Sequence, residues 1–220
     1  MTQHLPEITR LQLQRGRRQR VNIYLDEEYA FSLQLDLAAS LQRGQRLSAA
    51  EVEALKAEDA YRAALDRALA FLEHRPRSRR EVQDKLIGED CDPIPVERVL
   101  ERLEALALVD DARFAEWWVS NRLQHRPRGE RALRHELRQR GIDEAVAQAA
   151  VQGLDEHELA RRVALEQAER YRGHDRQRFD RRLGSWLQRR GFGWEAVRGA
   201  LDHAWRQVET SDPGDASTQG

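Results

Sequence analysis

Arginine is the residue type whose pattern in this chain most clearly indicates chemistry, because clusters of it recur within an internal repeat. The segment His74-Arg75-Pro76-Arg77-Ser78 returns as His125-Arg126-Pro127-Arg128-Gly129, and each copy leads into an arginine-rich helical pattern. A guanidinium group donates paired hydrogen bonds to phosphate or carboxylate oxygens, and the free N–H groups at a helix start favour the same anions. The repeat therefore predicts a row of anion-binding positions.

The candidate binding residues lie around three such helix starts and along the helices that follow. They are Arg75, Arg77, Arg79, Arg80, Arg126, Arg128, Arg131, Arg134, Arg138, Arg178, Arg181, Arg182, Arg189 and Arg190. Arg176 stands at the start of the third cluster as well. A solvated basic face is the alternative interpretation of any single cluster, and recurrence at equivalent positions makes binding as good an interpretation as a solvated face.

Catalytic and metal-binding patterns are not evident in the sequence. The 7 histidines include no pair with the close helical spacing and neighbouring carboxylate of a metal site. Gly191-Phe192-Gly193 lies at a helix boundary and does not follow a strand, unlike a phosphate-cradling loop. We therefore expect no enzyme activity, no catalytic residue, no bound metal and no cofactor.

The amino-terminal segment has a different apolar pattern from the helical region that carries the arginine clusters. Apolar residues alternate in three short runs between residues 8 and 35, separated by Arg15-Gly16-Arg17 and by Asp26-Glu27-Glu28. This pattern predicts a small three-stranded antiparallel sheet. Such a sheet is marginal alone, so we expect its apolar face to pack on the helix that follows.

From Ser48 onward the apolar period is helical. Ser48 with Glu51 and Ser78 with Glu81 form capping-box patterns, each of which predicts a helix start. The first long helical segment, Ala49 to Glu73, is expected to break near Glu58-Asp59, because its apolar stripe drifts out of phase there.

The repeat unit is predicted to be a three-helix module. Gly141 and Gly191 stand where a second helix must end, as glycines in a left-handed conformation do. The pair Trp117-Trp118 favours a structural role over base stacking, with Trp117 in the core and Trp118 at an interface with the neighbouring repeat. Stacked modules make a long surface and not one enclosed pocket.

The predicted fold class is mainly α, with tandem three-helix modules in an elongated array preceded by the small sheet. The expected boundaries are 1–46 for the β extension and connecting helix, 47–109, 110–154 and 155–206 for the three modules, and 207–220 for a disordered tail. No apolar run approaches the roughly 18 residues of a transmembrane helix. We expect a cytoplasmic protein with no membrane partner.

Several motifs in order resemble the bacterial RecX recombination regulators, in the longer form with an amino-terminal β extension. The first module carries Arg75-Pro76-Arg77-Ser78 with Glu81-Val82, and then Leu108-Val109-Asp110-Asp111-Ala112-Arg113-Phe114. The second carries Glu136-Leu137 before Arg140-Gly141-Ile142, and the third carries Leu187 before Arg190-Gly191-Phe192. The resemblance spans about residues 8–205, including Val21-Asn22-Ile23-Tyr24-Leu25-Asp26.

The resemblance implies a non-enzymatic monomer that binds the RecA recombinase filament on single-stranded DNA, with double-stranded DNA as a further partner. It implies suppression of ATP hydrolysis, strand exchange and coprotease support, and hence a place in DNA repair, recombination and the SOS response. Which face contacts RecA and which contacts DNA stays open at this point.

Two other classes of function compete with this one. A three-helix module with a basic helix resembles helix-turn-helix architecture, so a direct DNA-binding repressor is the first alternative. It would recognise a particular duplex sequence. A purely protein-binding helical scaffold is the second, and its affinity for DNA would be negligible and nearly insensitive to salt.

Overall fold

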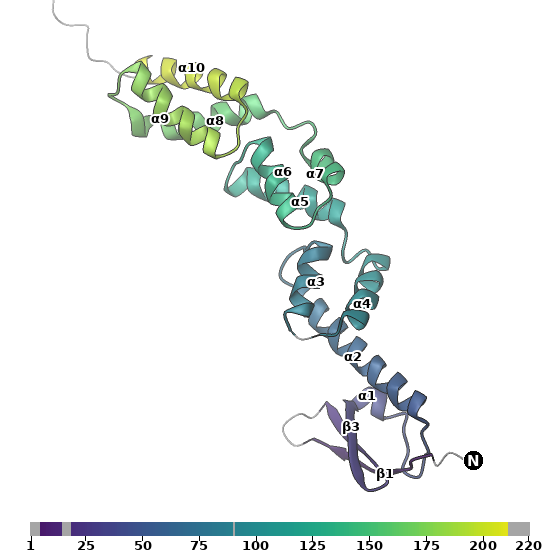
Figure 1. The fold of residues 1–220 in the computed structure, drawn as a ribbon. Helices are drawn as coiled ribbons and strands as arrows, with labels where there is room; N and C mark the ends of the chain where they lie inside the picture. The colour runs from purple at the N-terminus through teal and green to yellow at the C-terminus, as the bar shows by residue number, and fades with distance from the viewer. Residues whose placement is uncertain (1–4, 15–18, 90, 211–220) are drawn as a thin grey trace, which may run out of the picture. The chain divides into compact units, whose positions relative to one another are not determined.

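The computed structural model describes residues 5–14, 19–89 and 91–210. The turn expected at Arg15-Gly16-Arg17 and the last ten residues of the expected tail, 211–220, lie outside these ranges. The chain divides into two compact units, residues 1–75 with 82–108, and residues 76–81 with 109–220. Each unit is built mainly from helices, and the first also contains one small sheet (Figure 1). The predicted fold class, tandem three-helix modules preceded by a small sheet, is confirmed.

The sheet contains β1 (Ile8–Leu13), β2 (Arg20–Leu25) and β3 (Glu28–Gln34), paired antiparallel in the order β1-β2-β3. Its strands alternate as predicted, and Ile8, Ile23 and Leu33 are fully buried on one face. That face packs with α1 (Leu35–Ala38) and with the first turns of α2 (Ala49–Leu72). The helix that follows therefore stabilises the sheet, as its small size requires.

Helix α2 begins at the predicted capping box, where Ser48 Oγ accepts from the Glu51 N–H and Glu51 Oε2 accepts from the Ser48 N–H at 2.7 Å. The hydrogen bonds that the Glu51 carboxylate accepts from the Ser48 N–H, and then from the Ser48 hydroxyl, lower the pKa of the Glu51 carboxyl. The break expected near Glu58-Asp59 is wrong, because α2 is continuous over 24 residues. The stripe drifts where α2 leaves the sheet: Val52 and Leu55 pack on the sheet core, and Asp59 is the buried polar residue that accepts from Gln34 N and pairs with Arg20 at 2.8 Å.

The first module consists of the second half of α2 with α3 (Arg79–Ile87) and α4 (Pro93–Ala105). Its predicted apolar face on α4 is buried, with Val99, Leu100 and Leu103 fully inaccessible to solvent. The second module consists of α5 (Asp111–His125), α6 (Glu130–Gln139) and α7 (Glu144–Val151). Phe114 and the two α6 leucines, Leu133 and Leu137, occupy its core.

The tryptophan pair in α5 has the structural role that was expected, but the prediction that Trp117 is the core residue is wrong. Trp118 is the buried residue at 7% exposure, whereas Trp117 is half-buried at the edge of the same core. The Trp118 indole donates to Glu136 Oε2 at 3.0 Å. A buried indole N–H usually needs such an acceptor, and Glu136 supplies it from α6.

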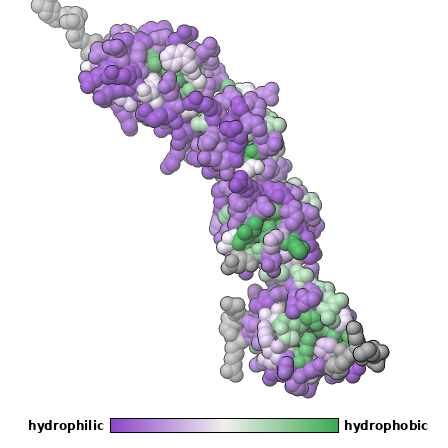
Figure 2. Space-filling view, viewed as in Figure 1, coloured by the Kyte–Doolittle hydropathy of each residue, from purple (hydrophilic) through white to green (hydrophobic). Residues whose placement is uncertain are grey.

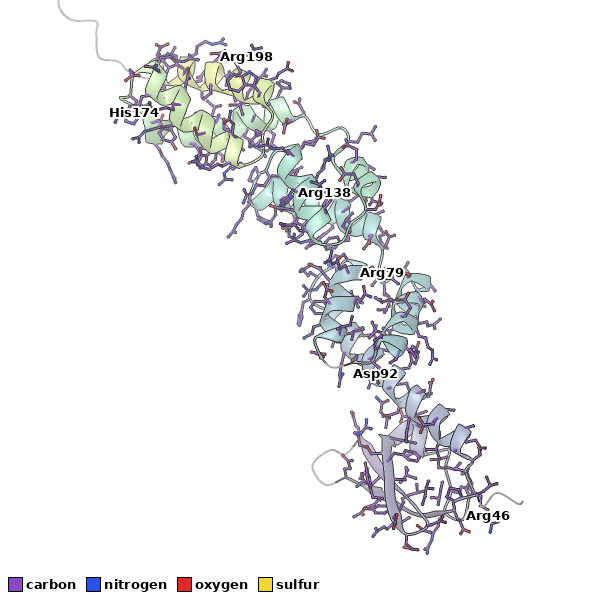
Figure 3. All side chains as sticks on the ribbon, viewed as in Figure 1. Arg46, Arg79, Asp92, Arg138, His174 and Arg198 are labelled. Atoms are coloured by element: carbon purple, nitrogen blue, oxygen red, sulfur yellow. The ribbon has the colours of Figure 1, made fainter. Side chains whose placement is uncertain are left out.

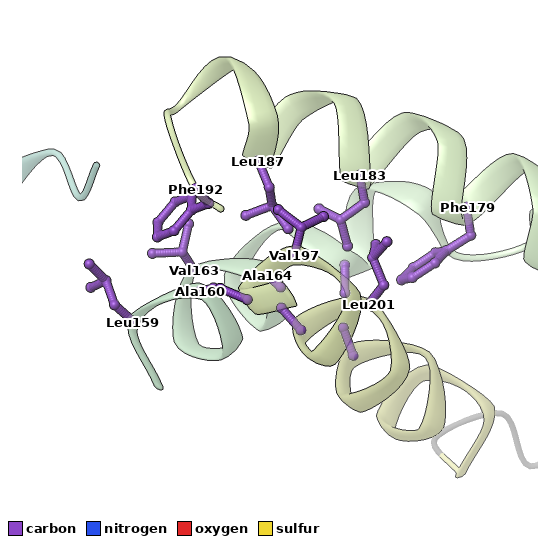
Figure 4. Close-up of a cluster of buried hydrophobic side chains, with 14 of the residues drawn as sticks. Leu159, Ala160, Val163, Ala164, Phe179, Leu183, Leu187, Phe192, Val197 and Leu201 are labelled. Carbon is purple, nitrogen blue, oxygen red and sulfur yellow. The ribbon is translucent and has the colours of Figure 1, made fainter. Parts of the chain in front are cut away.

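The third module contains α8 (Glu156–Ala168), η1 (Glu169–Tyr171), α9 (Arg176–Arg189) and α10 (Trp194–Thr210). Helix α10 continues to Thr210, beyond the boundary expected at 206. Its core is formed where Phe179, Leu183 and Leu187 of α9 meet Val197 and Leu201 of α10, above α8 (Figure 4). This packing fixes which faces of α9 and α10 are left at the surface.

Candidate functional site

At two of the predicted helix starts, the anion bound by the backbone N–H groups is a carboxylate of the protein itself. The backbone N–H of Arg79, the first residue of α3, donates to Asp111 Oδ1 at 2.8 Å. The backbone N–H of Glu130, the first residue of α6, donates to Glu156 Oε1 at the same 2.8 Å. Asp111 and Glu156 are each the first residue of the first helix of the following module. These N–H groups are thus unavailable to an external phosphate.

A second contact recurs beside the first and buries the same helix starts. The Ser78 hydroxyl donates to the carbonyl oxygen of Arg140 at 2.7 Å, and the Gly129 N–H donates to the carbonyl oxygen of Arg190 at 2.9 Å. Ser78 also caps α3 as predicted, accepting from the Glu81 N–H. The Arg140-Gly141 end of α6 therefore lies against the start of α3, and the Arg190-Gly191 end of α9 lies against the start of α6.

The glycines at these ends have the left-handed backbone that was predicted, with φ of +82° at Gly141 and +87° at Gly191. A Cβ at Gly141 would lie 2.5 Å from Cβ of Arg80. A Cβ at Gly191 would overlap Ala132, whose backbone nitrogen would be 2.6 Å away. Glycine is thus required both by the backbone and by the close approach of the neighbouring helix.

The first arginine cluster is engaged within the protein. Arg75, Arg77 and Arg79 are half-buried, and Arg80 is exposed. All four have an interaction with another part of the chain. Arg79 and Arg80 lie at a helix junction, where the Arg79 N–H meets Asp111 and the Arg80 side chain lies against Gly141.

The second cluster is largely neutralised by ion pairs on and around α6. Arg134 and Arg138 both pair with Glu144, the latter at 3.1 Å. Arg128 lies 3.7 Å from Glu136. The hydrogen bond from Arg134, followed by the charges of Arg134 and Arg138, lowers the pKa of the Glu144 carboxyl although desolvation opposes this.

Three further members of the candidate set lie in or near the junction between the second and third modules. Arg131 donates to the carbonyl oxygen of Gln188 at 3.3 Å, and Arg126 is exposed. The Arg190 guanidinium lies 4.1 Å from the Trp186 ring centroid and donates to the carbonyl oxygen of Pro127 at 3.2 Å. Burial, and then the charge of Arg128, lower the pKa of Arg190.

The third cluster is different, because its arginines are exposed on α9. The side chains of Arg178, Arg181, Arg182 and Arg189 make no hydrogen bond or ion pair with any other residue in the described ranges. Arg181, Arg182 and Arg189 line a shallow hollow of about 310 Å³ together with Tyr171 and Ser185. In Figure 2 the visible surface of this module is mostly hydrophilic. We call these four arginines the α9 arginine face.

Arg176, at the start of the same helix, is not part of this open surface. Its guanidinium bridges Asp180 at 2.7 Å and Asp202 at 2.5 Å. Burial lowers the pKa of Arg176, but the hydrogen bonds and charges of the two aspartates outweigh it and raise the pKa. The prediction from sequence missed Arg198 on α10, which is exposed and, as far as the chain is described, has no polar side-chain partner (Figure 3). The four-residue spacing between Trp194 and Arg198 was the sequence pattern that could have indicated that the two side chains lie on one face of α10.

Neither a metal centre nor a membrane span is found within the described ranges. No group of three or more histidine, cysteine, aspartate or glutamate residues there is arranged to hold a metal ion. None of the described helices combines the length and the apolar character needed to cross a membrane.

Family models match most of the chain in three consecutive segments. They are the regulatory protein RecX N-terminal domain over residues 6–48, the first three-helix domain of RecX over 64–103, and its second three-helix domain over 110–151. The regulatory protein RecX of Bacillus pumilus is 31% identical over 206 residues, covering 91% of this chain and 78% of the relative. That of Clostridium tetani is 29% identical over 211 residues, covering 91% and 95%.

Solved structures agree with these matches. A crystal structure of regulatory protein RecX has a TM-score of 0.70 and 28% identity, and the alignment covers 90% of this chain and 100% of that one. The crystal structure of RecX from Lactobacillus salivarius has a TM-score of 0.62 over 68% of this chain and 99% of that one. Its identity of 22% supports the similarity of fold alone.

Proposed function

Because the chain belongs to the RecX family of regulatory proteins, we propose that it is a non-enzymatic regulator of the RecA recombinase. In this proposal it binds RecA filaments on single-stranded DNA in the cytoplasm as a monomer. It inhibits their ATP hydrolysis, strand exchange and coprotease activities, and so acts in recombination, DNA repair and the SOS response.

The structural observation that best supports this proposal is the α9 arginine face. None of the arginines of the first cluster is free, and Arg134 and Arg138 of the second pair with Glu144. Within the described residues, by contrast, the side chains of Arg178, Arg181, Arg182 and Arg189 make no hydrogen bond or ion pair. Guanidinium groups that are exposed and close together attract phosphates, and a filament formed on DNA offers a continuous row of them. A regulator of such a filament needs a surface of this kind and no catalytic centre.

The helix-turn-helix alternative is disfavoured by the junctions for the first two modules. A recognition helix places its amino-terminal residues against base edges in the major groove. The starts of α3 and α6 instead lie against Arg140 and Arg190, and Asp111 and Glu156 hold their first N–H groups. Neither α3 nor α6 can enter a groove by its start while these contacts persist.

The direct test is the ATPase rate of cognate RecA on single-stranded DNA, measured with increasing amounts of this protein. We expect the rate to fall as the protein approaches the amount needed to occupy the filament. The matched control is the Arg178→Glu, Arg182→Glu variant, which is expected to keep the fold but has a reversed α9 surface. An unchanged ATPase rate together with selective binding of one duplex sequence would support the repressor instead. An unchanged rate with no salt-sensitive DNA binding would support the scaffold.

A further inference from the structure

A groove between α9 and α10 combines an exposed aromatic ring with two arginines, Arg181 and Arg198, that form no ion pair within the described residues. It has a volume of about 330 Å³, at the lower end of the range of ligand pockets, which is about 300–1,000 Å³. Trp194 stands at its edge with 64% of its surface exposed, whereas Trp118 is buried and Trp186 and Trp205 are partly buried. Trp194 is therefore the indole most available to a partner among these.

Helical spacing explains why these side chains converge. Trp194 and Arg198 are four residues apart on α10, so they lie one turn apart on the same face. Arg181 and Ser185 have the same spacing on α9 and line the opposite side of the groove. Gly184 lets the two helices approach, since a Cβ there would lie 3.3 Å from Leu201 Cδ1.

The charges in the groove favour an anionic ligand with a flat apolar part. Its two carboxylates, Asp180 and Asp202, are both held by Arg176 on the groove wall. The side chains of Arg181 and Arg198 are exposed and form no hydrogen bond or ion pair within the residues described. Arg181 and Ser185 also line the shallow hollow of the α9 arginine face, so the groove adjoins that face.

From this arrangement we infer that the α9–α10 groove binds one nucleotide of single-stranded DNA. The base stacks on the Trp194 indole, and Arg181 and Arg198 bind its flanking phosphates. Stacking on an aromatic side chain needs an unpaired base, which single-stranded DNA provides and duplex DNA does not. An acidic peptide would satisfy the guanidinium groups but would leave the indole without a flat partner. This inference rests on the proposed function, because it locates the DNA contact of the same regulator.

The test uses the full chain and a fluorescein-labelled oligothymidylate, with binding followed by fluorescence anisotropy. Trp194→Ala is expected to weaken binding about tenfold, within the range for loss of one stacked base. Trp194→Phe should recover most of the affinity, because it keeps an aromatic face. The matched control is Ile94→Ala, which removes another exposed apolar side chain, 78% exposed, from the start of α4. Circular dichroism checks that each variant is folded.

Photo-crosslinking identifies the contact directly. An oligothymidylate that carries 5-iodouracil should crosslink to Trp194 in the wild-type chain, and mass spectrometry of the digested complex locates the modified residue. Wild-type affinity in Trp194→Ala, no binding of the oligonucleotide by the wild-type chain, or a crosslink only to residues outside the groove would each overturn the inference.

RecA ATPase assays separate this inference from the proposed function. If the wild-type chain inhibits RecA but Trp194→Ala binds the oligonucleotide normally, the regulator stands and the nucleotide site fails. If oligonucleotide binding depends on Trp194 but the wild-type chain leaves RecA unaffected, the site stands and the regulator fails. If Trp194→Ala loses inhibition while keeping oligonucleotide affinity, the groove contacts protein, and the nucleotide site is wrong.

Discussion

The carboxylate of Glu156 accepts a hydrogen bond from the backbone N–H of Glu130 at 2.8 Å, and so joins the third module to the second. Its other oxygen accepts from the N–H of Gly193, just before α10, at 3.3 Å. The same arrangement, with Asp111 and Arg79, recurs one repeat earlier. The carboxylates of Asp111 and Glu156 lie at the electropositive starts of α3 and α6 and stabilise the two junctions. They occupy the positions at which the sequence pattern predicted a bound phosphate.

Removal of this carboxylate should destabilise the second compact unit. Glu156→Ala leaves the first N–H of α6 without its acceptor, and the loss of such a cap costs about 1 kcal/mol. Urea unfolding followed by tryptophan fluorescence measures this selectively, since all 5 tryptophans lie within residues 109–220. The control is Glu158→Ala on the same helix, whose exposed pair with Arg161 contributes little. Equal shifts of the two variants would contradict a junction role for Glu156.

Gly191, at the same junction, can be compared with Gly153, which has the same backbone conformation but lies away from the junction. Gly191 and Gly153 both have φ of +87°, but a Cβ at Gly153 meets no atom within 4 Å, whereas one at Gly191 overlaps Ala132. Gly153→Ala should cost about 1–2 kcal/mol for the left-handed backbone alone. Gly191→Ala should cost clearly more, because helix α6 must also move. Urea unfolding of both variants by tryptophan fluorescence measures the difference, and a difference of zero would mean that the junction yields without cost.

Charge reversal should separate the α9 arginine face from the paired arginines of α6. Arg178→Glu with Arg182→Glu should raise the amount of protein needed to inhibit RecA ATPase and reduce its dependence on salt, by a slope of about 0.7 for each phosphate that the variant no longer binds. Arg134→Gln with Arg138→Gln should leave inhibition nearly unchanged, because Glu144 already engages both side chains. The measurement is half-maximal inhibition over a salt series. A larger effect from the α6 pair would place the binding surface on α6.

Apolar spacing was sufficient to predict the modules because it reflects local packing. Leu133 and Leu137 are one helical turn apart, and both are fully buried, as their spacing requires. Apolar spacing did not predict that α2 is continuous, because its apolar stripe drifts out of phase at Asp59. Nothing near Asp59 in the sequence shows that its partner, Arg20, lies on a strand far earlier in the chain. The drift marks a change of packing partner and not an end of the helix.

The candidate site shows the same limit in its electrostatics. All three arginine clusters look alike in sequence, but only the structure shows that Arg134 meets Glu144 from another helix while Arg182 has no such partner among the described residues. The anion at the α6 start is likewise supplied by Glu156, which belongs to the next module. Ion pairs between elements depend on tertiary packing, and helical spacing carries no information about it.

The ion pairs of α6 should give the stability of the second unit a defined acid dependence through Glu144. Its hydrogen bond with Arg134 holds the pKa of the Glu144 carboxyl below the ordinary value of 4.5, so the folded state favours the charged form. The unfolded chain binds this proton more readily, so the stabilisation is complete above about pH 4.5 and is lost as the pH falls through the lowered pKa. The difference in unfolding free energy between the wild-type chain and Glu144→Gln should therefore shrink on acidification. Urea unfolding by tryptophan fluorescence over this pH range measures it, with Arg134→Gln as the control in which the pKa returns toward 4.5. A difference that stays constant across the range would show that the pair does not form in solution.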